Sequence, residues 1–277
     1  MRKFVISDLH GDGALYRSIM CYLDSLSLKE DVSLYIDGDL IDRGEDSFPI
    51  LMDVMNRIKN GNFPITYLGG NHEQMMYQVY DKRFRGLSTN YNNWYRNGGW
   101  ITDQKLVDTL KTKEEIFELI DRISHLKLYH IMDEKIQNQN IILVHAACLD
   151  TVNKNNPLEI KDDTIQTDSF LWTRENDPYF GFRCDINRSP FFAIVGHTPN
   201  GKELGYEYHK KDSFLNIDGS FRDTMAMVEV QDGYLRILSF NNRNEIVAGS
   251  YLDGKGEYSF HKKELKEENK ILQKTFQ

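Results

Sequence analysis

Three short apolar runs, each followed at once by a glycine-containing polar segment, constrain the fold of this chain most. The runs cover residues 4–7, 32–36 and 65–68, and the stretches between them carry apolar residues at helical spacing over 14–26 and 50–58. Short apolar runs bounded by turn residues indicate buried strands, and strands that alternate with helices form parallel sheets. The opening of the chain therefore predicts a β-α-β-α-β unit with a polar segment at the carboxyl end of each strand.

Two later predicted strands end in the same way. Residues 141–144 run into His145, and residues 191–195 run into Gly196-His197. Ligands of α/β sheets collect outside the carboxyl ends of the strands, so we expect the five polar segments to converge. A single histidine after a strand is more often structural than functional, but five strand ends that each carry a metal-binding side chain indicate one site. These side chains are Asp8, His10, Asp39, Asn71, His145 and His197.

The chemistry of this set favours a pair of transition-metal ions. Two carboxylates, three imidazoles and one amide suit Mn, Fe or Zn better than Ca or Mg alone. Six protein ligands are too many for one open catalytic ion and too few to enclose two. We therefore expect two divalent ions that share one bridging carboxylate, with Mn as the first ion to test and Fe or Zn as alternatives. Such a pair can hold a bridging hydroxide that attacks phosphorus directly.

The order and spacing of the motifs resemble those of a known enzyme family. The match runs in order from residue 8 to residue 197. The family is that of the calcineurin-like metallophosphoesterases, in its phosphoprotein phosphatase (PPP) branch, of the bacterial serine/threonine protein phosphatase type. The resemblance implies an α/β sandwich of two mixed β-sheets flanked by helices, with the metal site at the carboxyl ends of strands. The motifs are Asp8-x-His10-Gly11, Gly38-Asp39-x-x-Asp42-Arg43-Gly44, Gly70-Asn71-His72-Glu73, His145 and Gly196-His197.

By position, the resemblance also implies a role for each metal ligand. The first ion would be bound by Asp8 and His10, and Asp39 would bridge the two ions. The second ion would be bound by Asn71, His145 and His197.

Four further residues match the catalytic positions of the family. His72 would be the general acid that protonates the leaving oxygen, and Asp42 would orient its imidazole. Arg43 matches the phosphate-binding arginine, and Arg174 resembles the second one on a looser motif.

The pair of arginines favours a terminal phosphate dianion as substrate. The first hypothesis is therefore a phosphomonoesterase that hydrolyses phosphoserine and phosphothreonine, with phosphotyrosine as a further candidate, in a phosphorylated protein or a small phosphorylated molecule. The alternative is a symmetrical dinucleoside tetraphosphate hydrolase, in which the aromatic stretch 91–100 would stack a base. A third hypothesis is a non-catalytic metal-binding interaction module, against which the complete ligand set argues.

The composition points to an intracellular globular protein. The chain has 277 residues, 40% of them hydrophobic and 27% charged, and its net charge of −8 disfavours binding to a nucleic-acid backbone. The apolar run over 4–6 is too short for a signal peptide, and three cysteines form no disulfide framework. We expect a cytoplasmic protein without membrane or nucleic-acid partners; its oligomeric state stays open.

The length and pattern predict one catalytic domain over 1–252 and a charged, solvated appendage over 253–277 that contains a helix over 262–274. The aromatic segment 73–99 is interpreted as a helical insertion with its own small core rather than a substrate-shaping cap. Strands over 126–132 and 141–146 are expected to be joined by a polar link, 133–140. Alternation on both sides of Asp232-Gly233 predicts a hairpin.

Overall fold

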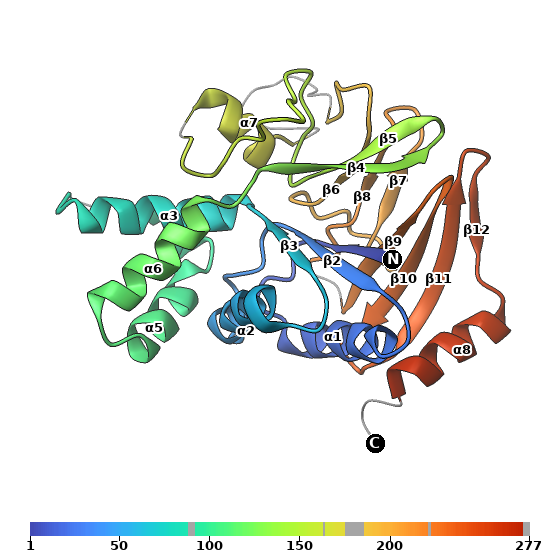
Figure 1. Cartoon of the computed structure of the whole chain (residues 1–277), viewed down its shortest axis with the longest axis horizontal. Helices are drawn as coiled ribbons and strands as arrows, with labels where there is room; N and C mark the ends of the chain where they lie inside the picture. Colours follow the sequence, from blue (N-terminus) through green and yellow to red (C-terminus); the bar gives the residue numbers. More distant parts are fainter. Residues whose placement is uncertain (88–91, 163, 175–185, 221–222, 274–277) are drawn as a thin grey trace.

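The computed structural model describes residues 1–87, 92–162, 164–174, 186–220 and 223–273 (Figure 1). Its first part is the predicted β-α-β-α-β unit, in which each strand pairs in parallel with the next. Asp12 caps the first helix, because its Oδ1 accepts hydrogen bonds from Ala14 N and Leu15 N, both at 3.0 Å. The elements are β1 (Arg2–Ile6), α1 (Gly13–Ser27), β2 (Val32–Asp37), α2 (Ser47–Asn60) and β3 (Ile65–Leu68).

The strands form two mixed sheets, which confirms the predicted fold class. The seven-stranded sheet has the order β12-β11-β10-β9-β1-β2-β3, and the five-stranded sheet has the order β4-β5-β6-β8-β7. The predicted hairpin around Asp232-Gly233 is present as β9 and β10. The remaining strands are β4 (Tyr129–Ile136), β5 (Gln139–Val144), β6 (Phe192–Val195), β7 (Glu207–His209), β8 (Phe214–Asn216), β9 (Thr224–Gln231), β10 (Tyr234–Asn241), β11 (Ile246–Asp253) and β12 (Glu257–Ser259).

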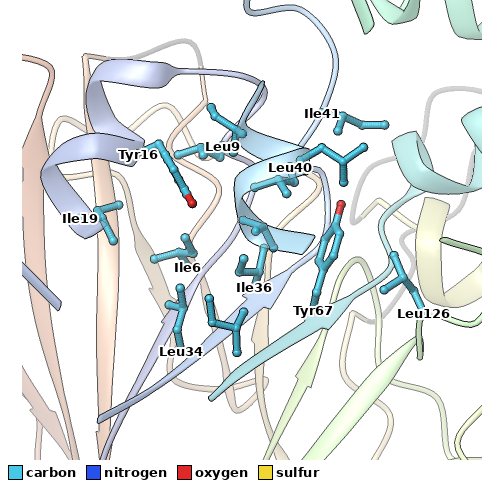
Figure 2. Packing of buried hydrophobic residues seen from close by; sticks show 14 of the residues in the cluster. Ile6, Leu9, Tyr16, Ile19, Leu34, Ile36, Leu40, Ile41, Tyr67 and Leu126 are labelled. Atoms are coloured by element: carbon cyan, nitrogen blue, oxygen red, sulfur yellow. The ribbon is translucent and has the colours of Figure 1, made fainter. Parts of the chain in front are cut away.

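The two sheets pack face to face, and helices cover the outer face of the larger sheet (Figure 1). Apolar side chains of β2 alternate between the layers: Leu34 and Ile36 contribute to the core beneath α1 and α2, whereas Tyr35 contributes to the core between the sheets. Figure 2 shows the helix-side core, into which Leu40 and Ile41 of the loop after β2 pack together with Tyr67 of β3. The loops that carry the site are therefore anchored to the hydrophobic core.

The prediction for the β4–β5 hairpin is wrong in its boundaries. The predicted polar link 133–140 belongs largely to the strands, and only Gln137 and Asn138 form the turn, with φ of 52° and 64°. The pairing register shifts between Ile131 and Lys135, so a bulge interrupts the alternation of buried and exposed residues. Ile136, at the end of β4, is fully buried.

The segment after β3 is helical, as predicted. Its helices are α3 (Asn71–Phe84), α4 (Asn92–Arg96), α5 (Gly99–Thr109) and α6 (Lys113–Ser124), and α6 begins with a capping box of Thr112 and Glu115. The expectation of a separate small core is wrong, because Trp94 and Leu106 belong to the same core as β1 and β2. Within the described residues, every helix is too short or too polar to cross a membrane.

The C-terminal part contains the expected helix, α8 (Lys262–Gln273), but only one face of it is solvated, and the other packs on the fold. Leu272 is fully buried, and α8 packs beside α1 and β11 (Figure 1). Glu268 accepts a hydrogen bond from Tyr22 Oη at 2.5 Å and pairs with Arg236 of β10. β12 continues the large sheet. The division of the chain at residue 252 stays a prediction.

Candidate functional site

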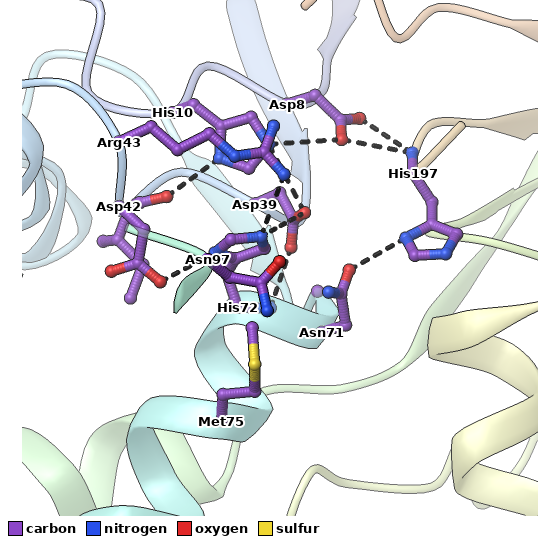
Figure 3. A network of polar contacts seen from close by, with 12 residues as sticks. Asp8, His10, Asp39, Asp42, Arg43, Asn71, His72, Met75, Asn97 and His197 are labelled. Carbon is purple, nitrogen blue, oxygen red and sulfur yellow. Dashed lines mark hydrogen bonds and ion pairs between the residues drawn. The ribbon is translucent and has the colours of Figure 1, made fainter. Parts of the chain in front are cut away.

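The predicted metal ligands meet at one edge of the two sheets. They lie on the loops after β1, β2, β5 and β6 and at the first residue of α3, which follows β3 (Figure 3). All of them are buried, with exposed fractions between 0% and 8%. The ligands brought together are Asp8, His10, Asp39, Asn71, His145 and His197.

The backbone of these loops is left-handed at the site itself. Of the ten non-glycine residues with positive φ in the described part of the chain, six are predicted site residues. This conformation is tolerated by Asp and His but costs free energy for most side chains. The sharp reversals turn successive side chains towards one point instead of along the strand. The six are Asp8 (53°), His10 (46°), Asp39 (50°), Asp42 (73°), Arg43 (68°) and His197 (65°).

Two compact groups of ligand atoms share Asp39. One contains His10 and His72, and the other contains His145 and His197; in each group all ligand atoms lie within 4.8 Å of one another. A carboxylate common to both groups has the position that a bridging ligand needs. The sharing therefore agrees with the role expected for Asp39.

Asp8 and Asn71 complete the two sides. Asp8 Oδ1 lies 3.9 Å from His10 Nε2, so it reaches the first group from its edge. Asn71 Oδ1 lies 3.1 Å from His145 Nε2 and 2.9 Å from His197 Nδ1, at the centre of the second group. The six predicted ligands thus converge as two adjoining sets.

The orientation of the imidazoles fits metal binding. His10 Nδ1 lies 3.0 Å from the carbonyl oxygen of Ile41, and His145 Nδ1 lies 2.9 Å from that of Asp37. A carbonyl oxygen can only accept, so each Nδ1 carries the proton and Nε2 of the neutral ring is left with a lone pair directed to the site. Fixing the second nitrogen in this way is typical of metal-binding histidines.

The electrostatics of the buried groups also fit cations. Burial raises the pKa of Asp8 well above its usual value, and nearby Asp218 adds to the effect. Burial opposes ionisation of Asp39 too, but His145, His72 and His10 together outweigh burial and hold the pKa of Asp39 well below its usual value. Burial by itself would lower the pKa of His145. The attraction and hydrogen bond of Asp39 act in the opposite direction, and the pKa of His145 lies well above its usual value. Divalent ions would displace the additional proton of His145 and balance the negative charge of the clustered carboxylates.

His72 lies between an orienting carboxylate and a guanidinium. Its Nδ1 is 2.7 Å from Asp42 Oδ2, and its Nε2 is 3.3 Å from Arg43 Nη2 and 3.8 Å from Asp39 Oδ2 (Figure 3). Burial lowers the pKa of His72, but Asp39 and Asp42 outweigh burial and raise it. The adjacent fixed positive charge makes Nε2 a poorer place for a cation than for an anionic oxygen. The ligand atoms of His72 also fall within the first group, beside those of His10 and Asp39.

The second predicted arginine lies near His197 of the second ligand group. Arg174 follows α7 (Ile165–Trp172), and its charge contributes, after burial and His145, to lowering the pKa of His197 well below the usual value. Arg43 belongs to the side of His10 and His72. The two predicted arginines are thus associated with different ligand groups, Arg43 with the first and Arg174 with the second.

A cavity of about 460 Å³ opens beside the first ligand group. Its wall includes Asp8, His10 and Arg43, together with residues from the start of α1 and of β9. A cavity of this size, with a few convergent polar groups, is typical of a small-molecule or side-chain site. Its other lining residues are Leu9, Gly11, Asp12, Gly13, Leu15, Gly44, Gly219, Ser220, Thr224 and Met225.

The structure adds one site residue to which the sequence assigned no role. The fully buried carboxylate of Glu73 accepts four hydrogen bonds: Oε2 from Asp39 N at 2.9 Å and Gly70 N at 2.8 Å, and Oε1 from Leu40 N at 3.0 Å and Tyr67 Oη at 2.7 Å. It thereby joins the loop after β2 to the loop after β3. The sequence signals are its membership of the motif Gly70-Asn71-His72-Glu73 and its place at the third position of a helix, where Glu often accepts from the backbone.

Solved structures of other proteins share this fold. A crystal structure of a candidate diadenosine tetraphosphatase superposes with a TM-score of 0.52 at 15% identity, covering 94% of this chain and 92% of the other. A protein serine/threonine phosphatase from Saccharomyces cerevisiae with similarity to human phosphatase PP5 superposes with a TM-score of 0.52 at 13% identity, covering 84% and 73%. At these identities the likeness concerns the fold. A search of curated protein sequences finds no match.

The sequence itself identifies the family. Residues 1–223, most of the chain and all of the predicted ligands, match the calcineurin-like phosphoesterases. This family indicates a metal-dependent hydrolase, which agrees with the two groups of buried His and Asp side chains. The chain therefore belongs to the calcineurin-like phosphoesterase family.

Proposed function

We propose that this protein is a phosphomonoesterase that hydrolyses phosphoserine and phosphothreonine in proteins, with two divalent ions bound at the shared Asp39. The observation that carries the proposal is the arrangement around His72. Its ring is held by Asp42 on one side and faces Arg43 and Asp39 on the other. This arrangement suits binding of a phosphate and protonation of its leaving group at the same place.

The metal ligands would be divided as the resemblance implies. Asp8 and His10 would hold one ion and Asn71, His145 and His197 the other, with Asp39 shared. Bound ions supply Lewis acidity, which activates water as the nucleophile and neutralises charge on the phosphoryl oxygens. Mn is the proposed ion because the ligand set mixes imidazole nitrogen with carboxylate and amide oxygen.

The protein's own residues would bind the phosphate and move the proton. Arg43 and Arg174 would hold the phosphoryl oxygens of the dianion from two sides. His72 Nε2 would give its proton to the oxygen of the departing serine or threonine, so that a neutral hydroxyl leaves. Asp42 would keep His72 Nδ1 protonated and the ring oriented throughout. General-acid assistance of this kind contributes about 10²- to 10⁴-fold.

The structure weakens the argument for the alternative function, dinucleoside tetraphosphate hydrolysis, which relied on base stacking by the aromatic stretch 91–100. Trp94, in the aromatic stretch expected to stack a base, is 1% exposed and donates a hydrogen bond to Asp42 Oδ2 at 2.8 Å. An indole in this position cannot offer a face to a base. Trp100 is 52% exposed and keeps the alternative testable, whereas Tyr91 lies outside the described residues.

The test is hydrolysis by chelator-stripped protein reconstituted with Mn, measured as inorganic phosphate from the peptides and as ADP from the dinucleotide, because symmetrical cleavage of the latter yields two ADP molecules and no free phosphate. A phosphoserine/phosphothreonine peptide, a phosphotyrosine peptide and diadenosine tetraphosphate are offered separately at equal concentration. We expect the highest kcat/KM with the serine/threonine peptide and no turnover before Mn is added. A preference for the dinucleotide would refute the proposed substrate class.

The role of His72 has its own test. His72→Gln removes the acidic proton but keeps an amide of similar reach. We expect turnover of the phosphoserine peptide to fall about 10²-fold or more, and turnover of 4-nitrophenyl phosphate to fall far less, because its leaving group needs no proton. Equal losses on both substrates would remove the general-acid assignment.

A further inference from the structure

The turn that carries Asp42 and Arg43 is strained and needs support from elsewhere. Both residues have left-handed backbone conformations, with φ of 73° and 68°. This conformation costs free energy for most non-glycine residues, more for Arg than for Asp, and it persists only where surrounding contacts determine it. Asp42 is also fully buried, so its carboxylate oxygens and its N–H group all need hydrogen-bond partners.

That support comes from α4, α5 and the turn between them. Trp94 Nε1 donates to Asp42 Oδ2 at 2.8 Å, and Thr102 Oγ1 donates to Asp42 Oδ1 at 2.6 Å. Thr102 Oγ1 also accepts from Asp42 N at 3.2 Å, and Arg43 N donates to the carbonyl oxygen of Gly98 at 3.4 Å. We call Trp94, Gly98 and Thr102 the helical clamp.

Glycines at the α4–α5 turn allow the clamp to come this close. A Cβ atom on Gly98, which has a φ of 95°, would lie 2.7 Å from Arg43 N. A Cβ atom on Gly99 would lie 2.2 Å from Trp94 Nε1, the atom that donates to Asp42. Both distances are shorter than real contacts of this kind, so a larger residue would displace the clamp.

The clamp is in turn fixed to the rest of the fold. Asp103, next to Thr102, pairs with Arg83 of α3 through two hydrogen bonds of 2.8 and 2.9 Å. The same carboxylate accepts from Tyr80 Oη at 2.6 Å and from Tyr95 of α4. The clamp is therefore a braced part of the fold, with Asp103 tying α4 and α5 to α3.

We propose that Trp94 and Thr102 are positioning residues for the catalytic step: through Asp42 they set the orientation of His72, and through the turn they set the place of Arg43. This inference rests on the proposed function, because it takes His72 as the general acid. The carboxylate of Asp42 has three donors in fixed directions, His72 Nδ1, Trp94 Nε1 and Thr102 Oγ1, so it cannot rotate freely. A carboxylate held in this way fixes both the tautomer and the ring plane of His72.

The test uses Thr102→Val, Trp94→Phe and, as a matched control, Thr102→Ser. Val keeps the volume of Thr but has no hydroxyl, whereas Ser keeps the hydroxyl. Each Mn-reconstituted variant is assayed with a series from 4-nitrophenyl phosphate to phenyl phosphate and phosphoserine, and its metal content is measured. The series does not depend on which substrate is physiological, so the inference and the proposed substrate class can fail separately.

We expect Thr102→Val and Trp94→Phe to lower kcat about 10- to 100-fold for the poor leaving groups and less than about threefold for 4-nitrophenyl phosphate. Thr102→Ser should stay within about threefold of the unaltered protein on every substrate. Equal losses along the series, or no loss, would overturn the inference. If Thr102→Val does not fold, Trp94→Phe decides in the same way, and His72→Gln shows whether the general-acid assignment itself has failed.

Discussion

Replacing Glu73 by Gln tests whether one buried carboxylate holds the two central loops of the site together. In the best orientation of the amide, its oxygen keeps the N–H groups of Asp39 and Gly70, and Tyr67 Oη turns to accept from the new NH₂ group. The N–H of Leu40 then faces another donor and loses the partner it has at 3.0 Å. Glutamine can therefore replace the shape of Glu73 but not its four accepted hydrogen bonds.

The magnitude follows from these contacts. An unpaired buried N–H costs about 1–3 kcal/mol, and two hydrogen bonds that lose their charge cost about 0.5–1 kcal/mol each. Against this, burial raises the pKa of Glu73, with Asp39 adding to the effect, so a neutral side chain recovers part of the cost of the buried charge. The expected decrease in the free energy of unfolding is about 2–4 kcal/mol, a large share of the stability of a typical domain.

The assay is urea unfolding of metal-free protein, with stability obtained from the midpoint and the slope. The control is Glu115→Gln, because Glu115 has the equivalent position in the capping box of α6 but is exposed. This substitution should shift the unfolding midpoint far less than Glu73→Gln. A decrease below about 1 kcal/mol for Glu73→Gln, or equal effects of the two substitutions, would refute the reasoning.

Two further predictions concern the metals and the pH dependence of stability. Asp39→Asn should lose both ions in elemental analysis, whereas His10→Ala should lose mainly one; two ions retained by Asp39→Asn would contradict the bridging role. Burial tends to raise the pKa of Asp103, but Arg83, Tyr80 and Tyr95 outweigh burial and hold this pKa below the usual value. The ionised carboxylate therefore stabilises the fold above about pH 4, and this stabilisation is lost as the pH falls through the lowered pKa. Asp103→Asn should therefore destabilise the fold by about 1–2 kcal/mol at pH 7 and by less below pH 4 in urea unfolding, and a gap that stays constant with pH would disprove the ionic contribution.

The strand ends of the site could be predicted from sequence because each motif follows an apolar run that can only be a buried strand. The β4–β5 hairpin could not, because the bulge between Ile131 and Lys135 breaks the alternation on which strand prediction depends. Asp133, Glu134 and Lys135 then resemble a polar loop, although they belong to β4.

The contacts of the helical clamp with Asp42 and Arg43 could not be predicted from the sequence either. Trp94 lies 52 positions after Asp42, and an aromatic residue among Asn and Arg predicts an interaction surface as readily as a buried donor. Only the folded backbone, with Gly98 and Gly99 at the contact, shows that the indole turns inward. Glu73 was hidden for the same reason: its place at the start of a helix suggests a local cap, whereas two of its four donors, Asp39 N and Leu40 N, come from the loop after β2.

The left-handed residues of the site have a consequence for anyone who redesigns this fold. Glycine would relieve the backbone at Asp8, His10, Asp39 and His197, so a procedure that only seeks greater stability would choose those positions early. The same substitutions would erase the ligand set. Conversely, the cluster of left-handed turns at neighbouring strand ends marks the place of the site in the backbone alone, whereas only the side chains at those turns show whether a distant relative keeps its ligands.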